Sequence, residues 1–274
     1  MKYTLLLLIF SIIHLNGQMK FSSNFRIPHQ PLNVEEFGIT THNFYYKVTF
    51  SANKNSAHKR EAICILQVGE NISKFFDLNQ LKQDSALRRY DHKNFLDATD
   101  VNEIFKNRIL WTNIVVKNYD KLTVQDRFRS LYQYDETKPD FNWKLEEGSK
   151  KILNYNCNKA TINYAGRTYT AWYTKDIPFS NGPYKFEGLP GMILEIHDTN
   201  NDFHFEAVGI DTTANSIYLR RDKEIFLVSK EKFRTVQLSY YENPGFFHGT
   251  AYGADGKQLD IGSNKLPYNL IELE

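Results

Sequence analysis

The sequence has few cysteines, little net charge and no long apolar run beyond its first residues. Among 274 residues there are 2 cysteines, and 34 basic residues nearly balance 32 acidic ones, which gives a net charge of +2. Such a balance argues against a surface for nucleic acid or for an anionic membrane. Downstream of the start, no apolar stretch reaches the length of a membrane helix.

The scarcity of cysteine leaves room for one disulfide at most. Cys64 and Cys157 can pair if the protein occupies an oxidising compartment. Alternatively, both thiols pack as small apolar groups in the core. The sequence alone leaves both possibilities open.

The single apolar run, "YTLLLLIFSII", follows Lys2 and is followed by the small residue Gly17. A charged start, a short apolar run and a small residue are typical of a signal peptide, so we expect residues 1–17 to be removed. No cysteine stands near the cleavage site to carry a lipid. We therefore predict a soluble exported protein, periplasmic or secreted, with one mature domain over residues 18–274 and no transmembrane span.

Aromatic residues are plentiful, with 20 Phe and 17 Tyr, and they recur with period two. Segments such as "HNFYYKVTF" and "EAICILQVG" are typical of antiparallel strands with one buried face. A turn at Gly166 predicts a hairpin between the alternating runs of residues 160–164 and 168–173. Residues 80–100 are charged and poorly periodic, which predicts a long loop with at most one short helix.

One late amphipathic helix is predicted over residues 230–241, where Ser229 can cap the first turn and Pro244 stops the last. The fold class that we expect is mainly β, with a single antiparallel, strongly curved sheet or open barrel and this one helix.

The segment Gly188, Leu189, Pro190 and Gly191 combines two glycines with a proline just before the apolar run "MILEIH". Proline followed by glycine suits the centre of a type II turn, with glycine supplying the positive φ. We expect this turn to start a central strand at Met192, and "FHFEAVGI" to return beside it as a second hairpin.

The stretch "GLPGMI", together with the ending "YNLIELE", resembles the GLPGLI family of exported Bacteroidota proteins over residues 40–274, with Met192 in place of a leucine. A second, weaker similarity is to the N-terminal bowl-like domain of a bacterial type II peptide:N-glycanase. That similarity implies an antiparallel β architecture and an accessory role near glycans. The family has no established activity, so the resemblance supplies no catalytic residue and no cofactor.

The motifs of several enzyme classes are missing, among them G-x-S-x-G, H-E-x-x-H and Cys-x-x-Cys. Cys157 is a candidate nucleophile because Lys159 stands two residues away, where a cation can lower the thiol pKa. A paired or buried cysteine is the simpler reading. Asp176, Glu187 and Asp198 lie beside turns and could form a carboxylate pair for glycoside cleavage, although turn carboxylates are ordinary.

A metal site is conceivable on one hairpin. Glu195 and His197 share a strand face, and His204 or Glu206 can lie opposite them. These residue types could hold zinc or copper. Since the spacing is not compact, a solvated polar face with cross-strand charge pairs explains them more simply. We therefore predict no metal and no cofactor.

A binding surface has a better basis in the sequence. Aromatic rings and planar donors gather near "GPYKF", and together they suit a saccharide or a peptide; they are Arg167, Trp172, Tyr173, Tyr184, Lys185 and Phe186. The alternative is that most of these rings are core, and the same ambiguity covers Trp111 and Trp143.

The function that the sequence favours is that of a non-catalytic envelope protein that binds a glycan, a peptide or a partner protein. A hydrolase acting on envelope or host glycans is the first rival, and it requires carboxylates clustered in a cleft. A structural accessory of an outer-membrane transporter or secretion assembly is the second, and it requires a flat apolar patch.

Overall fold

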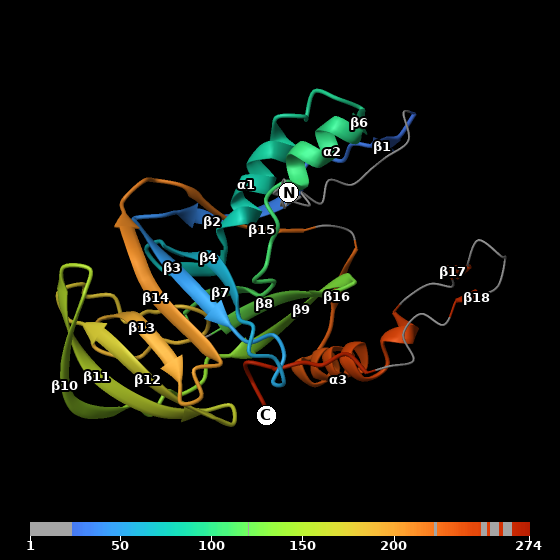
Figure 1. Ribbon diagram of the computed structural model, residues 1–274. Helices are drawn as coiled ribbons and strands as arrows, with labels where there is room; N and C mark the ends of the chain where they lie inside the picture. Colours follow the sequence, from blue (N-terminus) through green and yellow to red (C-terminus); the bar gives the residue numbers. More distant parts are fainter. Residues whose placement is uncertain (1–23, 120, 222–223, 248–250, 253–257, 260–264) are drawn as a thin grey trace, which may run out of the picture.

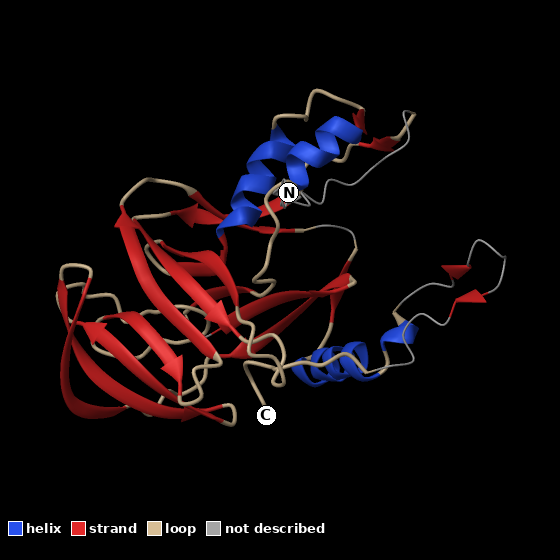
Figure 2. Ribbon diagram, viewed as in Figure 1, coloured by secondary structure: helices blue, strands red, loops and turns tan. Residues whose placement is uncertain are grey.

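The computed structural model describes residues 24–119, 121–221, 224–247, 251–252, 258–259 and 265–274. The predicted signal peptide, residues 1–17, lies outside the described residues. The described chain is mainly β, and its helices stand at the margins of a large sheet (Figure 2).

The main sheet has twelve strands in a linear order, with β10 and β16 at its two edges (Figure 1). In sheet order these are β10 (Lys144–Ile152), β11 (Tyr155–Tyr164), β12 (Arg167–Thr174), β13 (Met192–Asp198), β14 (Phe203–Asp211), β3 (His42–Phe50), β4 (Arg60–Val68), β5 (Ile72–Asp77), β7 (Ile114–Asn118), β8 (Lys121–Phe128), β9 (Ser130–Thr137) and β16 (Ile225–Leu227). Because the order is linear, the sheet is not closed into a barrel.

The expectation of a single antiparallel sheet is wrong. Strand β16 runs parallel to β9, with Ile225 opposite Leu131, so the large sheet is mixed. A periodic pattern predicts a strand but not its direction, which here follows from the path of the chain after β15. The described residues also form three two-stranded sheets, which pair β1 (Arg26–Pro28) with β6 (Phe95–Asp97), β2 (Val34–Ile39) with β15 (Ser216–Arg220), and β17 (Ala251–Tyr252) with β18 (Gln258–Leu259).

The prediction of one helix is also wrong, because residues 80–100, expected as a loop, contribute to α1 (Leu78–Arg88) and α2 (Ala98–Phe105). Each helix begins at an aspartate: Asp77 accepts from the backbone N–H of Asn79 at 2.8 Å, and Asp97 forms a capping box with Asp100. Ala86 of α1 and Val101 and Ile104 of α2 form a small separate cluster with Leu96, which precedes α2. So small a cluster leaves a weak periodic signal.

The late helix is confirmed as α3 (Lys230–Glu242), and the turn η1 (Pro244–Phe246) follows it. Ser229 caps it by accepting from the backbone N–H of Lys232 at 3.2 Å. Phe233 is buried against the main core, beside rings of β8 and β9. Figure 1 shows the C-terminal segment running alongside this helix.

The expected hairpin at Gly166 is confirmed, with β11 and β12 joined by Ala165 and Gly166, both at positive φ. Strand β13 then lies between β12 and β14, within the sheet. In the second hairpin Glu195 faces Glu206 and His197 faces His204, as the sequence predicts.

The segment between β12 and β13, residues 175–191, is folded into the interior. Phe186 is fully buried and its ring packs with the rings of Phe141, Trp143, Tyr164, Tyr169 and Tyr184. The buried Lys117 of β7 donates to the backbone oxygens of Gly182 and Phe186 at 2.8 Å each. Ring packing around Phe186 and the hydrogen bonds from Lys117 therefore hold this segment in place.

Gly191 has a φ of +144°, and a Cβ at this position would lie 2.0 Å from the backbone oxygen of Thr174. No other residue type fits so close an approach. The prediction of a type II turn is wrong, because the Met192 N–H donates to Ile177 instead of Leu189, while the Gly191 N–H donates to Leu189 at 2.8 Å.

None of the helices within the described ranges combines the length and the apolar character needed to cross a membrane.

Candidate functional site

A cavity of about 880 Å³ lies where α3 and the C-terminal segment meet the ends of several strands. The loop after β3, the loop before β7, and strands β8 and β9 complete its wall. Many aromatic side chains stand in that wall, beside charged and polar ones: they are Phe50, Trp111, Phe128, Tyr134, Tyr184, Phe203, Phe233, Tyr240 and Tyr241. Such a volume and lining are typical of a small-ligand site.

Trp111 is the centre of one part of this wall. Its ring meets those of Phe50 at 5.4 Å, Tyr184 at 6.1 Å and Phe203 at 6.5 Å between centroids, always edge to face. These are the geometries that aromatic rings prefer. The ring of Trp111 is therefore held in one orientation, and its indole N–H with it.

Two buried N–H donors in the wall have no hydrogen-bond partner within the described part of the chain. They are Nε1 of Trp111 and Nδ2 of Asn269, in residues that are 4% and 7% exposed. An unpaired buried donor costs about 1 to 3 kcal/mol, so such groups are rare in folded proteins.

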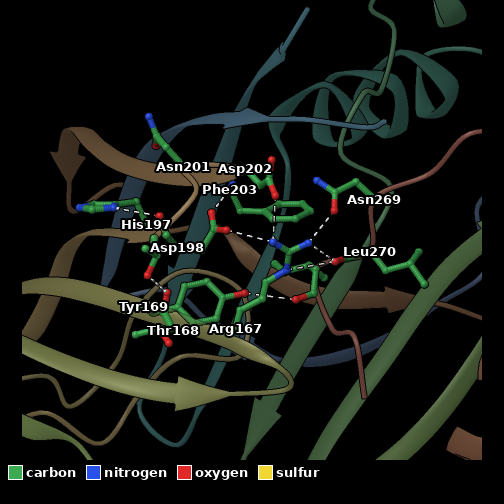
Figure 3. Close-up of polar contacts among 12 residues, drawn as sticks. Arg167, Thr168, Tyr169, His197, Asp198, Asn201, Asp202, Phe203, Asn269 and Leu270 are labelled. Atoms are coloured by element: carbon green, nitrogen blue, oxygen red, sulfur yellow. Dashed lines mark hydrogen bonds and ion pairs between the residues drawn. The ribbon is translucent and has the colours of Figure 1, made fainter. Parts of the chain in front are cut away.

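Arg167 fixes the orientation of the Asn269 amide. Its Nη2 donates to Oδ1 of Asn269 at 2.6 Å (Figure 3). A guanidinium has no acceptor, so the amide oxygen must face Arg167. The NH₂ group of Asn269 is consequently turned away from Arg167 and remains available.

Arg167 lies behind the cavity wall and holds the C-terminal segment to the sheet. It donates to Asp198 at 2.9 Å, to Asp202 at 3.1 Å and to the backbone oxygen of Leu270 at 2.7 Å (Figure 3). Its guanidinium carbon also lies 4.8 Å from the centre of the Phe203 ring. All of its contacts are internal, so Arg167 positions the site rather than reaching into it.

Lys185 forms a second buried polar centre. Its side chain is 0% exposed, and Nζ lies 2.5 Å from Glu136, 2.5 Å from Glu272 and 3.0 Å from the hydroxyl of Tyr134. Tyr184 donates to Glu272 at 2.7 Å. Burial raises the pKa of Glu272, but the charge of Lys185 and these hydrogen bonds outweigh it and hold that pKa below its usual value.

Helix α3 joins the same centre from the rim. Lys230 lies 2.6 Å from Glu136, and Arg234 donates to the backbone oxygens of Glu272 and Leu273 at 2.7 and 2.8 Å. The helix and the C-terminal segment are thereby joined into one side of the cavity.

Asp126 contributes a buried carboxylate to the wall. It accepts from Nδ2 of Asn113 and from the backbone N–H of Arg127, both at 2.7 Å. Burial raises its pKa, against the effect of these hydrogen bonds. A carboxyl group in such surroundings can donate as well as accept a proton.

Of the ring residues expected to bind, Tyr184 is the one that lines the cavity. Tyr173 and Phe186 are buried in the core. Trp172 is half-buried, and Nζ of Lys150 lies 5.9 Å from its ring centre. The structure therefore places these rings in different surroundings, although the sequence grouped them in one site.

The two ambiguous tryptophans have different surroundings. Trp111 stands in the cavity wall, whereas Trp143 is half-buried and its Nε1 donates to the backbone oxygen of Glu187 at 2.8 Å. A pattern of apolar residues cannot distinguish a paired indole from an unpaired one.

The candidate metal ligands are occupied by other contacts. Glu195 accepts from His204 at 3.1 Å and pairs with Lys150, while Glu206 lies 3.9 Å from a lysine of β3. His197 meets His204 edge to face at 5.7 Å. Among the described residues no group of three or more His, Cys, Asp or Glu side chains could hold a metal ion.

The candidate carboxylates for glycoside cleavage do not meet in the cavity. Asp198 pairs with Arg167, Glu187 pairs with Lys138 at 3.0 Å, and Asp176 is exposed beyond the end of β12. Asp126, which the sequence did not single out, is the wall carboxylate that burial perturbs.

Both cysteines are free and buried, so the possible disulfide is not formed in this structure. Four strands lie between β4, which carries Cys64, and β11, which carries Cys157. Burial raises the pKa of Cys157 to about 11, and Lys159 pairs with Glu146 at 3.1 Å instead of the thiol. These surroundings oppose a nucleophilic role for Cys157.

Comparison with known proteins gives one family match. Residues 163–195, which contain Gly188–Gly191, match a family described as "Protein of unknown function (Porph_ging)". This match supports the resemblance inferred from the sequence as far as a family of unknown function. No curated protein matches this chain.

Two solved structures of PNGF-II, in the P21 and C2 space groups, are similar to this chain at 15% identity and a TM-score of 0.45. The similarity covers 73% of this chain, which spans about one third of the length of PNGF-II (33% and 32%). These values are too low to carry over a residue or an activity.

Proposed function

We propose that this protein is an exported binding protein whose ligand, a glycan or a peptide, occupies the cavity beneath α3. Export is inferred from the first 17 residues of the sequence. The observation that carries the binding role is the cavity of about 880 Å³, in whose wall aromatic side chains stand beside charged and polar ones.

The lining of the cavity favours a ligand over a purely structural role. The aromatic side chains of its wall offer apolar burial to a ligand. The charged and polar side chains beside them offer hydrogen bonds that fix its orientation.

The two rival functions find less support. A hydrolase would use Asp126, a carboxylate of the cavity wall whose pKa burial raises. Its activity would be detected as release of a product from a bound probe. A structural accessory needs a flat apolar patch, whereas the feature described here is concave.

A pair of alanines on the loop after β3 provides the test. Ala52 is half-buried in the cavity wall, and Ala57 is exposed on the same loop outside the wall. We expect Ala52→Trp to fill part of the cavity and to weaken binding at least about tenfold. Ala57→Trp should leave binding unchanged.

The parent protein is screened against a glycan array and a displayed peptide library, and each hit is titrated calorimetrically with the parent and both variants. Thermal unfolding verifies that the variants are folded. A hit that Ala52→Trp does not weaken binds elsewhere, and the absence of any hit in both screens contradicts the proposed function.

A further inference from the structure

The two edges of the main sheet differ in how they are protected against a further strand. At the β10 edge the register shifts between Glu146 and Ser149, and exposed lysines stand on both sides of this bulge at Lys144, Lys150 and Lys151. Bulges and lysines are devices that keep other strands from pairing with a sheet edge. Strand β10 is therefore a protected edge.

Strand β16, at the opposite edge, has neither device (Figure 1). Its three residues, Ile225–Leu227, carry no charge and pair with β9 without a register shift. The side chain of Phe226 belongs to a residue that is 53% exposed, and Leu227 is 72% exposed. An edge with exposed apolar side chains and no bulge is a template on which another strand can pair.

The main chain of β16 has one side free for such pairing. The N–H of Val228 donates to the backbone oxygen of Gln133 at 3.0 Å, so Val228 and, two residues before it, Phe226 bond toward β9. The N–H and C=O of Leu227 therefore point to the free side. Extended backbone continues as far as Ser229, with φ −75° and ψ 162°. Leu227 is thus the centre of an extended run over residues 225–229.

The sequence around Leu227 is complementary to itself in the antiparallel direction. A two-fold axis at Leu227 sets each residue opposite the one that lies equally far beyond Leu227 in a second copy. Phe226 is then opposite Val228. At the ends of the run, Glu224 is opposite Lys230. Glu224 is exposed, and Lys230, although paired within its own chain, has a side chain that is 40% exposed. Apolar residues thus meet apolar ones, and an acid meets a base.

We propose that β16 is a docking edge for a second copy of this chain, whose own β16 pairs with it antiparallel about a two-fold axis at Leu227. The contact covers the exposed side chains of Phe226 and Leu227 and gives partners to the outward backbone groups. Both molecules use the same surface, so assembly stops at the dimer. Because the paired run is short, the interface is small and the dimer forms reversibly.

A charge placed on the edge tests the contact. We expect sedimentation velocity to show the parent changing from monomer to dimer as its concentration rises toward about 100 µM, a range suited to a small interface. Leu227→Lys should weaken dimer formation at least about tenfold. Leu145→Lys makes the same change on β10, at a residue that is 60% exposed, and should have no effect. Thermal unfolding verifies that both variants are folded.

A cysteine at the proposed axis tests the register. Residues opposite each other in a hydrogen-bonded antiparallel pair have Cα atoms about 5.5 Å apart, which is within the range of a disulfide. Mild oxidation of Leu227→Cys should therefore give a covalent dimer, whereas Leu145→Cys should remain monomeric. Cys64 and Cys157 are buried, so the introduced thiol is the accessible one in each variant.

Each outcome supports or overturns the proposal. Dimers that Leu227→Lys weakens and Leu145→Lys does not, together with a covalent dimer of Leu227→Cys, support it. A parent that stays monomeric at about 300 µM overturns it, as do dimers that Leu227→Lys leaves unchanged. Dimers without a disulfide in Leu227→Cys overturn the two-fold axis at Leu227. A monomeric parent that binds a displayed peptide through Leu227 assigns the edge to a strand of another protein, and the second copy is then overturned.

Discussion

Two buried polar regions lie on neighbouring parts of the interior and differ in how their groups are paired. Around Lys185, the ammonium meets Glu136, Glu272 and the Tyr134 hydroxyl within 3.0 Å. In the wall of the cavity, the donors of Trp111 and Asn269 meet no protein acceptor among the described residues.

The difference indicates separate roles. A buried charge with close opposite charges fixes the arrangement of the elements that carry them, here the segment before β13, strand β9 and the C-terminal segment. An unpaired donor fixes nothing in the folded chain. The Lys185 region therefore stabilises the fold, whereas the two unpaired donors do not contribute to it.

Removing the cation from the paired region gives the largest expected effect. Lys185→Met leaves Glu136 and Glu272 buried without this partner and should lower the free energy of unfolding by about 3 to 5 kcal/mol. Lys230→Met removes a partly exposed lysine from the same carboxylates and should cost less than about 1 kcal/mol. Urea unfolding compares the two, and equal losses would contradict the distinction.

The segment that carries Lys185 depends on its last turn, which gives the next effect. Gly191→Ala should destabilise by roughly 2 to 4 kcal/mol, because a Cβ would meet the backbone oxygen of Thr174 and φ is positive. Gly188→Ala shares the positive φ, but its nearest neighbour is 3.6 Å away, so about 1 kcal/mol is expected. Denaturation midpoints in the reverse order would show that the close approach is unimportant.

Lys74 is a third buried lysine, and it differs from Lys185 because aromatic rings instead of carboxylates lie against its ammonium group. Nζ of Lys74 lies 3.9 Å from the ring centre of Phe76 and 4.6 Å from that of Tyr218. Burial lowers the pKa of Lys74 from 10.5 to about 7, while Asp84 opposes and Arg220 adds to this shift. In the folded protein, the neutral form of the Lys74 amine is therefore favoured at pH values above about 7.

Between pH 7 and 10.5 the unfolded chain binds a proton that folded Lys74 does not, so stability rises with pH through this window and is lost as pH falls toward 7. Lys74→Met should flatten the rise by up to about 1.4 kcal/mol per pH unit. Burial also lowers the pKa of Lys117 to about 7, so part of the slope should remain in this variant. An unchanged slope in urea unfolding series contradicts the assignment.

Local patterns predicted much of the sheet and its last helix. The hairpin at Gly166 follows from alternating rings and a glycine turn, and α3 follows from its Ser229 cap and its stop at Pro244. Helices α1 and α2 were missed, because α1 is mostly polar and α2 is only eight residues long, so neither gives an extended apolar period. The parallel pairing of β16 with β9 was missed because the spacing of apolar residues carries no information about strand direction.

The site was predicted only in part, since its parts come from distant segments. Tyr184 was named from its local aromatic cluster, and it does line the cavity. Asn269 was not named, because its role depends on Arg167, which is 102 residues away in sequence. Whether the indole of Trp111 is paired depends likewise on the packed structure, which no spacing rule describes.

The C-terminal segment has a consequence for the order in which the protein can be completed during synthesis. Tyr184 and Glu272, which meet in the interior, are 88 residues apart, so the earlier part leaves the ribosome long before its partner exists. Until then Lys185 has no access to Glu272, and burying it is unfavourable. The interior around Lys185, which Glu136 alone can neutralise until then, is therefore completed only when the C-terminal segment has been synthesised and has docked beside α3.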